Sequence, residues 1–440
     1  MLTLIPSASN LFSYSVVFLK IEKNYIMLRT LIRLKRRVGL HIKPKTLFSL
    51  RFFSKNISST TLLHKAVFMQ SWRCGTKDVR FWIQLLSWIN WFAFLSWFEI
   101  VRHFIINARN VSREYHIPLW KQFSELVYVA LYYGIPPEEY YLFSLFQSIA
   151  DIEDYVYCCE RKVWHDTFQL QRAISGFERP ISGLERSISA NNDSIELLRD
   201  KARFSEEIRR CGVITTPTLV FLASGASDLS PLFQQKSLFL KPVSGSRAQN
   251  CFKLTFDSSS EDYELEHYQR DNSHAYYGKP EIQAFVQKLV MGEPYIVQPL
   301  LVNHPWFDCV ATSELCVFRI ITANDSGRVE LVAGVLEITG PDGVKQNYNV
   351  NIDTGTISVS HVDCTVPDWI GICESCMKAH AQLSDLLTIG WDLALTPEGV
   401  VLLEGNYSWA TFPIQATLQQ PLLQTELASF YQKRLKQQSV

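Results

Sequence analysis

Two carboxylates near the C-terminal end, Asp392 and Glu404, have the spacing of a shared metal site. Asp392 lies at the start of one apolar run and Glu404 at the end of the next, and the turn sequence TPEG separates the two runs. This pattern predicts a β-hairpin in which the two carboxylates lie side by side, with Asn406 following on the same strand face. Such oxygen ligands suit Mg²⁺, which prefers one or two carboxylates together with substrate phosphates.

Basic residues upstream could bind phosphate groups. Lys241 ends a short apolar strand, and the segment that follows it contains Ser244, Gly245 and Ser246, whose backbone N–H groups could approach a phosphate. Lys201 begins a predicted helix that ends at the Cys-Gly pair 211–212. Taken alone, each lysine is also consistent with an ordinary surface charge.

Arg319 lies inside the apolar strand VFRIIT, where an unpaired charge is costly. If Phe318 and Ile320 face the core, alternation along the strand turns Arg319 toward the other side of the sheet, which we expect to be a cleft. An arginine stays protonated there, so it suits a γ-phosphate or a developing acyl-phosphate. Arg319 is therefore the candidate catalytic residue.

The composition is that of a globular protein with two or three domains. The 440 residues are 47% hydrophobic and carry no formal net charge. Basic residues concentrate between Lys20 and Lys55, and the remainder is mildly acidic, which argues against a nucleic-acid-binding protein. Ten cysteines without framework spacing predict reduced thiols and a reducing, cytoplasmic setting.

The chain divides by composition into five segments. A basic leader could be a targeting sequence, a membrane-surface arm or sequence ahead of a later start, and a helical region with a tryptophan-rich helix follows it. A near-repeat spaced by seven residues contains Gly and Pro, which favours a linker over a coiled coil. The predicted segments are 1–75 (leader), 76–172 (helical), 173–194 (linker), and 195–297 and 298–440 (two α+β subdomains).

Residues 81–98 include four tryptophans and no formal charge, close to the length of a membrane-spanning helix. A polar residue recurs every three positions, and tryptophan prefers the headgroup boundary, so a buried helix or one that lies on a membrane fits better than a span. The buried helix, the helix that lies on a membrane and the membrane-spanning helix all stay open. A helix that lies on a membrane would imply a peripherally membrane-associated protein.

Strands dominate after the linker. Apolar runs such as SLFLKP, YIVQPLL, RVELVAGVLEIT and GVVLLEGN are joined by short turns and interrupted by helical stretches near 200–211, 281–290 and 372–387. Short turns between strands are typical of antiparallel sheets, so the fold class that we expect is α+β.

The ordered strings DKARF, GVITTP, FLKPVSGS, VQPLLVNHP, FRIIT and GWDLALTPEGVVLLEGN resemble ATP-grasp enzymes. More closely, residues 195–423 resemble the sugar-transfer-associated ATP-grasp family, which is predicted to act in cell-surface polysaccharide synthesis. The GIPPEEYY segment at 134–141 is also similar to the N-terminal region of that family. The resemblance implies two α+β subdomains that clasp ATP, preceded by an all-helical region.

The resemblance also implies roles for individual residues. Lys201 and Lys241 would contact ATP phosphates, and Asp392, Glu404 and Asn406 would hold Mg²⁺. The backbone hinge against adenine would consist of Gln298, Pro299, Leu300 and Leu301. Val297 and Leu300 could supply apolar walls for the base.

The implied reaction is phosphorylation of a substrate carboxylate by ATP, followed by attack of an amine or similar nucleophile on the acyl-phosphate. The alternative is a non-catalytic nucleotide-binding or scaffold protein on the same fold, associated with membrane sugar-transfer machinery. It is suggested by the loop after Lys241, which is glycine-rich in these enzymes but reads Arg-Ala-Gln-Asn at 247–250.

Overall fold

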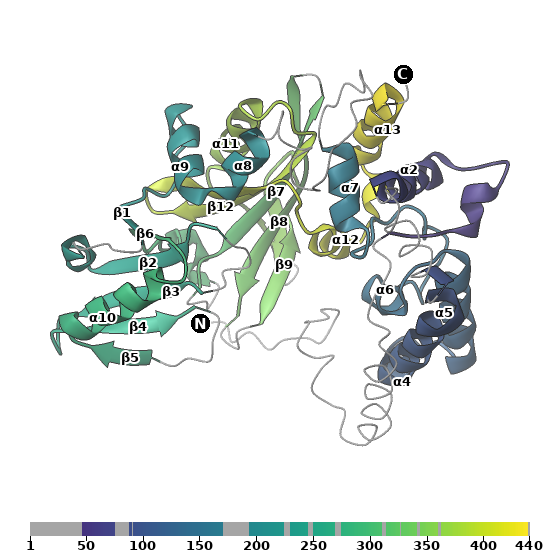
Figure 1. Ribbon diagram of the computed structural model, residues 1–440, viewed down its shortest axis with the longest axis horizontal. Coiled ribbons are helices and arrows are strands. Elements are labelled where there is room, and N and C mark those ends of the chain that lie inside the picture. The colour runs from purple at the N-terminus through teal and green to yellow at the C-terminus, as the bar shows by residue number, and fades with distance from the viewer. Residues whose placement is uncertain are drawn as a thin grey trace. The chain divides into compact units, whose positions relative to one another are not determined.

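The computed structural model describes most of the chain and divides it into two compact units (Figure 1). The first unit comprises Met1–Ile174, Thr339–Asn349 and Ser408–Val440, and the second comprises Ser175–Ile338 and Val350–Tyr407. Within these bounds the described residues are 46–74, 88–89, 91–169, 193–223, 229–244, 250–268, 274–309, 314–325, 327–340, 344–359 and 362–438. The leader up to residue 45 and the predicted linker up to residue 192 therefore lie outside the described residues.

The first unit is built from helices of both ends of the chain and one short strand from its middle. Between residues 76 and 172 every described element is a helix, as the sequence predicted. Its elements are η2 (Leu50–Phe53), α2 (Ser59–Cys74), η3 (Trp91–Leu95), α4 (Ser96–Tyr115), α5 (Leu119–Tyr132), α6 (Pro137–Leu142), α7 (Arg161–Phe168), β9 (Lys345–Asn349), α12 (Thr411–Leu418), η6 (Leu422–Gln424) and α13 (Leu427–Gln438).

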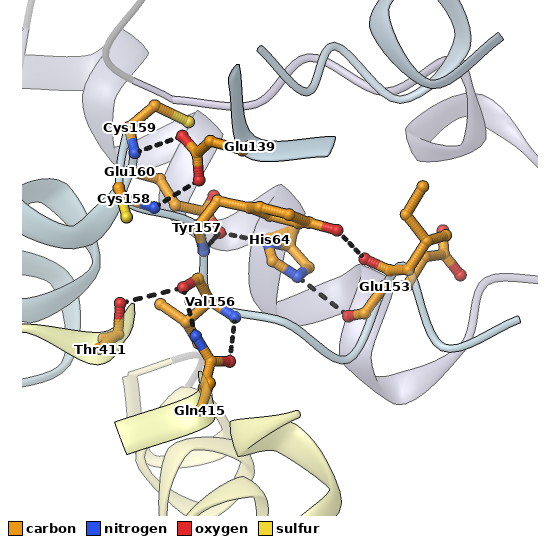
Figure 2. Close-up of polar contacts among 11 residues, drawn as sticks. His64, Glu139, Glu153, Val156, Tyr157, Cys158, Cys159, Glu160, Thr411 and Gln415 are labelled. Atoms are coloured by element: carbon orange, nitrogen blue, oxygen red, sulfur yellow. Dashed lines mark hydrogen bonds and ion pairs between the residues drawn. The ribbon is translucent and has the colours of Figure 1, made fainter. Parts of the chain in front are cut away.

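Helix α6 begins at Pro137, within the GIPPEEYY segment. Pro137 occupies the first turn, where its missing N–H costs nothing, and acidic residues follow it. One of them, Glu139, is buried and accepts hydrogen bonds from the backbone N–H groups of Cys158 and Cys159 at 2.7 and 2.9 Å (Figure 2). Burial raises the pKa of Glu139 to about 7. The helix start thus also fastens the segment before α7.

Side chains from distant parts of the chain hold the same segment. His64 of α2 forms an ion pair with the buried Glu160, with 2.8 Å between Nδ1 and Oε1. Gln415 of α12 accepts from the Val156 N–H and donates to its carbonyl, and Thr411 donates to that carbonyl as well (Figure 2). The C-terminal helices are therefore part of the first unit's core.

The tryptophan-rich stretch is described only in part, since residues 75–87 and 90 lie outside the described residues. Trp88 and Trp91 are buried, 9% and 1% exposed, in a cluster with Phe52 and Phe68, whereas Trp97 is 44% exposed. Burial favours the reading of this part as a core helix. In the part of the chain that the structure describes, no helix has the length and apolar character needed to cross a bilayer.

The second unit has the mixed helices and antiparallel sheets of the predicted α+β class. Its helices are α8 (Asp193–Arg199), α9 (Lys201–Arg210), η4 (Ser230–Phe233), α10 (Lys279–Val290), η5 (Pro305–Cys309) and α11 (Trp369–Ala381). Strands β10 (Thr356–Val359) and β11 (Val362–Thr365) form a small hairpin. The remaining strands form two larger sheets.

One sheet has the order β1-β6-β2-β3-β4-β5. Its strands are β1 (Val220–Leu222), β2 (Ser237–Pro242), β3 (Phe252–Asp257), β4 (Asp262–His267), β5 (His274–Tyr277) and β6 (Tyr295–Pro299). Alternation along β2 turns Leu238 and Leu240 into a core that also contains the buried residues of α10. Figure 1 shows α10 lying against this sheet. Phe239 and Lys241 therefore lie on the opposite face of this sheet.

The other sheet places strands β13 (Gly399–Asn406), β12 (Thr388–Thr396), β7 (Val317–Asp325) and β8 (Arg328–Thr339) side by side in that order. Every residue of β12 is buried, so this strand is central. Helix α11 packs against β7 and β12, and α8 and α9 pack against β13. Phe318, Ile320 and Trp391 fill this core side, each at most 1% exposed.

A chain of buried hydrogen bonds anchors β12 to α11. The Trp391 indole donates to Thr322 Oγ1 at 2.7 Å, the Thr322 hydroxyl lies 2.7 Å from His380 Nδ1, and His380 Nε2 lies 3.1 Å from the Leu386 carbonyl. A carbonyl can only accept, so Nε2 carries the proton and Nδ1 accepts from Thr322. Burial lowers the pKa of His380 to about 4.

Because the pKa of His380 is depressed, acid should destabilise this unit. As the pH falls below about 6.5, His380 becomes protonated in the unfolded chain but stays neutral in the folded protein. The free energy of unfolding therefore decreases between about pH 6.5 and 4. By pH 5 this group alone should cost about 2 kcal/mol. In His380→Gln, we expect the free energy of unfolding measured with urea to lack this part of the pH dependence. The exposed-site control His116→Gln should retain it, and equal slopes for both variants would contradict the assignment.

Candidate functional site

The predicted hairpin is present, and it brings its carboxylates together. Strands β12 and β13 pair antiparallel with Thr396 opposite Gly399 at the turn. Asp392 lies opposite Glu404, and Gly390 lies opposite Asn406. Directly opposite residues share a sheet face, so Asp392, Glu404 and Asn406 face the same side.

A β-bulge creates this alignment. From the turn to Leu393 the pairing is regular, with Leu393 opposite Leu402, but the register then shifts by one residue so that Asp392 meets Glu404 instead of Leu403. Without the shift, Glu404 would lie opposite Trp391 and point into the core, because a slip of one residue exchanges the two faces. The acidic pair thus depends on the bulge.

Gly405, between Glu404 and Asn406, is required by close packing. A Cβ at this position would lie 2.7 Å from the Trp391 ring and 2.7 Å from the Leu198 side chain. Both contacts are shorter than van der Waals distances, so α8 and the core tryptophan could not keep their positions against a larger residue. The Glu-Gly-Asn order therefore places two polar residues on one face and a tight backbone contact on the other.

Arg319 binds Asp392 through two hydrogen bonds. The residues lie opposite each other on β7 and β12, and Arg319 Nε and Nη2 donate to Oδ1 and Oδ2 of Asp392, each at 2.8 Å. Arg319 points away from the buried Phe318 and Ile320, as alternation predicted. Asp392 is the main cause of the raised pKa of Arg319, which Glu337 and Glu404 raise further. Glu337 of β8 is a nearby carboxylate that the sequence reasoning missed.

The two carboxylates interact with each other as well. Burial raises the pKa of Asp392, Arg319 opposes the rise, and the neighbouring Glu404 carboxylate adds to it. Asn406 Nδ2 donates to Glu404 Oε1 at 3.3 Å. Like charges held this close favour a site that binds a cation.

Lys241 approaches the acidic hairpin from the other sheet. Burial lowers the pKa of its ammonium group to about 8, Glu404 opposes that shift, and Lys201 contributes to it. Among the described residues, Lys241 has no hydrogen-bond or salt-bridge partner. A desolvated ammonium beside a second cation is costly unless an anion compensates it. The structure therefore brings Lys241, Lys201 and Glu404 close enough for Glu404 and Lys201 to influence the pKa of Lys241.

Cys251 is a neighbour of both lysines that no sequence signal indicated. It is 4% exposed and precedes β3 directly. Burial raises the pKa of its thiol to about 11, and Lys201 and Lys241 oppose that rise. The lysine of α9 and the lysine of β2 thus converge although forty residues separate them. Lys201 begins α9, whose N-cap Asp200 accepts from two backbone N–H groups.

The expectation that Val297 lines the base site is wrong. Val297 is fully buried in the core beneath α10, because it alternates with Ile296 and Gln298 along β6. Register places Ile296 opposite Lys241 and Gln298 opposite Phe239. The face that carries Lys241 therefore carries Phe239, Ile296 and Gln298.

The predicted hinge comprises the last two residues of β6, Gln298 and Pro299, and the two residues that follow, Leu300 and Leu301. Gln298 donates from Nε2 to the Thr216 carbonyl at 3.2 Å, and the Leu300 N–H donates to the Ser237 carbonyl at 3.2 Å. Pro299, Leu300 and Leu301 are partly buried. Ser244 is exposed, and Gly245 and Ser246 lie outside the described residues.

The acidic hairpin fits a magnesium ion that phosphate oxygens would also bind. Among the described residues, no group of three or more His, Cys, Asp or Glu side chains is placed to hold a metal. The hairpin offers two carboxylates and one amide, which is the small protein contribution that Mg²⁺ uses when a nucleotide completes its shell. The described cysteines, including Cys373 and Cys376 of α11, are free thiols.

No protein-family model matches this chain, and no curated protein is similar to it in sequence. Similar solved structures include D-cycloserine synthetase DcsG, with a TM-score of 0.33 at 14% identity over 55% of this chain and 70% of that one. D-alanyl-alanine synthetase A from Vibrio cholerae has a TM-score of 0.38 at 12% identity over 55% and 66% of the two chains. The ATP-grasp ligase PsnB has a TM-score of 0.32 at 13% identity over 51% and 57%.

Proposed function

We propose that this protein is an ATP-dependent ligase of the ATP-grasp type. The observation that carries the proposal is the convergence of Lys241 and Lys201 from one side and the acidic hairpin from the other. Cationic groups for phosphate oxygens and oxygen ligands for a divalent cation then lie at one place, which is the requirement for binding a metal–nucleotide complex.

In the proposed reaction a substrate carboxylate oxygen attacks the γ-phosphorus of ATP, and the bond to the β–γ bridging oxygen breaks to release ADP. An amine or similar nucleophile then attacks the carbonyl of the acyl-phosphate, phosphate leaves, and the nucleophile loses its proton to solvent. Lys201 and Lys241 orient the phosphates, and Arg319 stabilises negative charge on the transferred group. Bound Mg²⁺ would neutralise phosphate charge from the side of Asp392, Glu404 and Asn406.

The substrate class and cellular role extend this proposal. A carboxylate from cell-surface polysaccharide synthesis is supported by the sequence resemblance of residues 195–423. Peripheral contact of residues 81–98 with a membrane is supported at one position, since Trp97 is exposed whereas Trp88 and Trp91 are buried. Such contact would place the ligase beside membrane sugar-transfer machinery.

The proposal is tested by measuring ADP release from the purified protein with Mg²⁺ and ATP. A panel of amino acids and of uronic or other acidic sugars should contain a compound that stimulates release, with hydroxylamine present as a general nucleophile. The stimulated product should be the hydroxamate of that carboxylate, detected by mass spectrometry. ADP release that Glu404→Gln leaves intact would assign the activity to a contaminant or to another site.

A second candidate function is a nucleotide-binding protein without turnover. The specific observation in its favour is the bidentate Arg319–Asp392 pair, which engages both oxygens of a predicted metal ligand. Magnesium-dependent ATP binding by calorimetry, together with no ADP release across the whole panel, would favour this candidate over the ligase.

A further inference from the structure

The groups suited to phosphate and the groups suited to metal contact each other in this structure. Arg319 holds both oxygens of Asp392 at 2.8 Å. Glu404 lies close enough to Lys241 to oppose the effect of burial on its pKa. Asp392 is thus paired directly with an arginine of the neighbouring strand, Glu404 lies near a lysine of the other sheet, and the charges of these four groups cancel.

This cancellation makes it unfavourable for either ligand to bind alone. A divalent cation that reached Asp392 and Glu404 by itself would be repelled by Arg319, which is hydrogen-bonded to Asp392, and by the nearby Lys241. A nucleotide without metal would meet the two carboxylates in the same way. When both ligands arrive together, each repulsion is replaced by an attraction.

We propose that Arg319 holds Asp392 in the ligand-free protein and exchanges it for phosphate oxygens when a divalent cation replaces it, so that the binding of divalent cation and the binding of nucleotide are coupled. The inference rests on the proposed nucleotide site. Arg319 keeps Asp392 compensated in the absence of metal, and it is released to the transferred phosphoryl group only when a cation replaces it. Binding of one ligand then raises the affinity for the other, and by linkage the effect is reciprocal.

The experiment measures Mn²⁺ binding by the loss of the free-ion electron paramagnetic resonance signal, with and without a non-hydrolysable ATP analogue. In the unmodified protein, Mn²⁺ affinity should rise at least tenfold when the analogue is present. In Arg319→Gln, Asp392 loses its cation, so Mn²⁺ alone should bind about tenfold or more tightly than in the unmodified protein, and the difference made by the analogue should shrink.

Two further variants control this comparison. Arg328→Gln removes an arginine from the same sheet that is paired at the surface with Glu330, and it should leave Mn²⁺ binding unchanged. Arg319→Lys keeps the charge but not the two parallel hydrogen bonds, so its Mn²⁺ affinity should lie between those of the unmodified protein and Arg319→Gln. Arg319→Lys also replaces Arg319→Gln in the comparison if Arg319→Gln fails to fold because Asp392 is left unpaired.

The outcomes separate this inference from the proposed function. If the unmodified protein binds Mn²⁺ equally well with and without the analogue, partner exchange is overturned while the nucleotide site stands. The same holds if neither Arg319 variant gains Mn²⁺ affinity although the analogue still binds. If neither Mn²⁺ nor the analogue binds to any form, singly or together, the proposed function is overturned as well.

Discussion

Glu404→Gln is expected to lower ATP turnover about a thousandfold or more. Glutamine has the size of glutamate and retains an oxygen that can accept from Asn406, so the hairpin should keep its structure. The lost negative charge would remove one of the two carboxylates that face a bound cation. One charge pair at about 4 Å contributes roughly 4 kcal/mol at an effective dielectric of 20, which corresponds to about three orders of magnitude in rate.

The measurement is steady-state ADP release under the conditions that support activity of the unmodified protein. Glu398→Gln is the matched control, because Glu398 lies in the exposed turn of the same hairpin and makes the same change of charge. The control should retain activity. Equal activity of Glu404→Gln and the unmodified protein would remove the metal assignment, whereas equal loss in both variants would point to damage of the hairpin.

The hairpin shows what the sequence could predict about this site and what it could not. Two apolar runs around a Pro-Glu-Gly turn determine that the strands pair, and alternation determines that Arg319 faces away from Phe318. The bulge next to Asp392 has no comparable signal in the sequence, and it lies beside the tight contact between Gly405 and Trp391, which only the folded chain forms. From the turn alone, regular counting places Glu404 on the core face.

Contacts between distant segments are the second feature that the sequence could not predict. The convergence of Lys201, Lys241 and Cys251 requires that a helix end and two strand ends meet, which spacing along the chain does not encode. Likewise, nothing local in α12 shows that Gln415 will bind the backbone of Val156, 259 residues earlier. Val297 was misassigned for a simpler reason: an apolar residue beside a hinge fits either face until the core partner, α10, is placed.

Lys241→Met should weaken binding of a magnesium–ATP analogue by about a hundredfold to a thousandfold. Methionine fills the apolar part of the lysine's space, so the variant removes mainly the charge that faces the phosphates. The matched control is Lys288→Met, an exposed lysine on α10 of the same unit, which should bind as the unmodified protein does. Calorimetric titration of both variants measures the difference.

The pH dependence of this binding tests the same lysine without relying on one substitution. Burial lowers the pKa of Lys241 to about 8, so above that pH the free protein increasingly holds a neutral amine. Phosphate favours the ammonium form, and binding must then take up a proton, which should weaken affinity by up to about tenfold for each pH unit above 8. Lys241→Met should show no such fall between pH 8 and 9.5. If the affinity of the variant fell with the same slope, another group would be the one that titrates. The assignment of Lys241 to the phosphates would then be wrong.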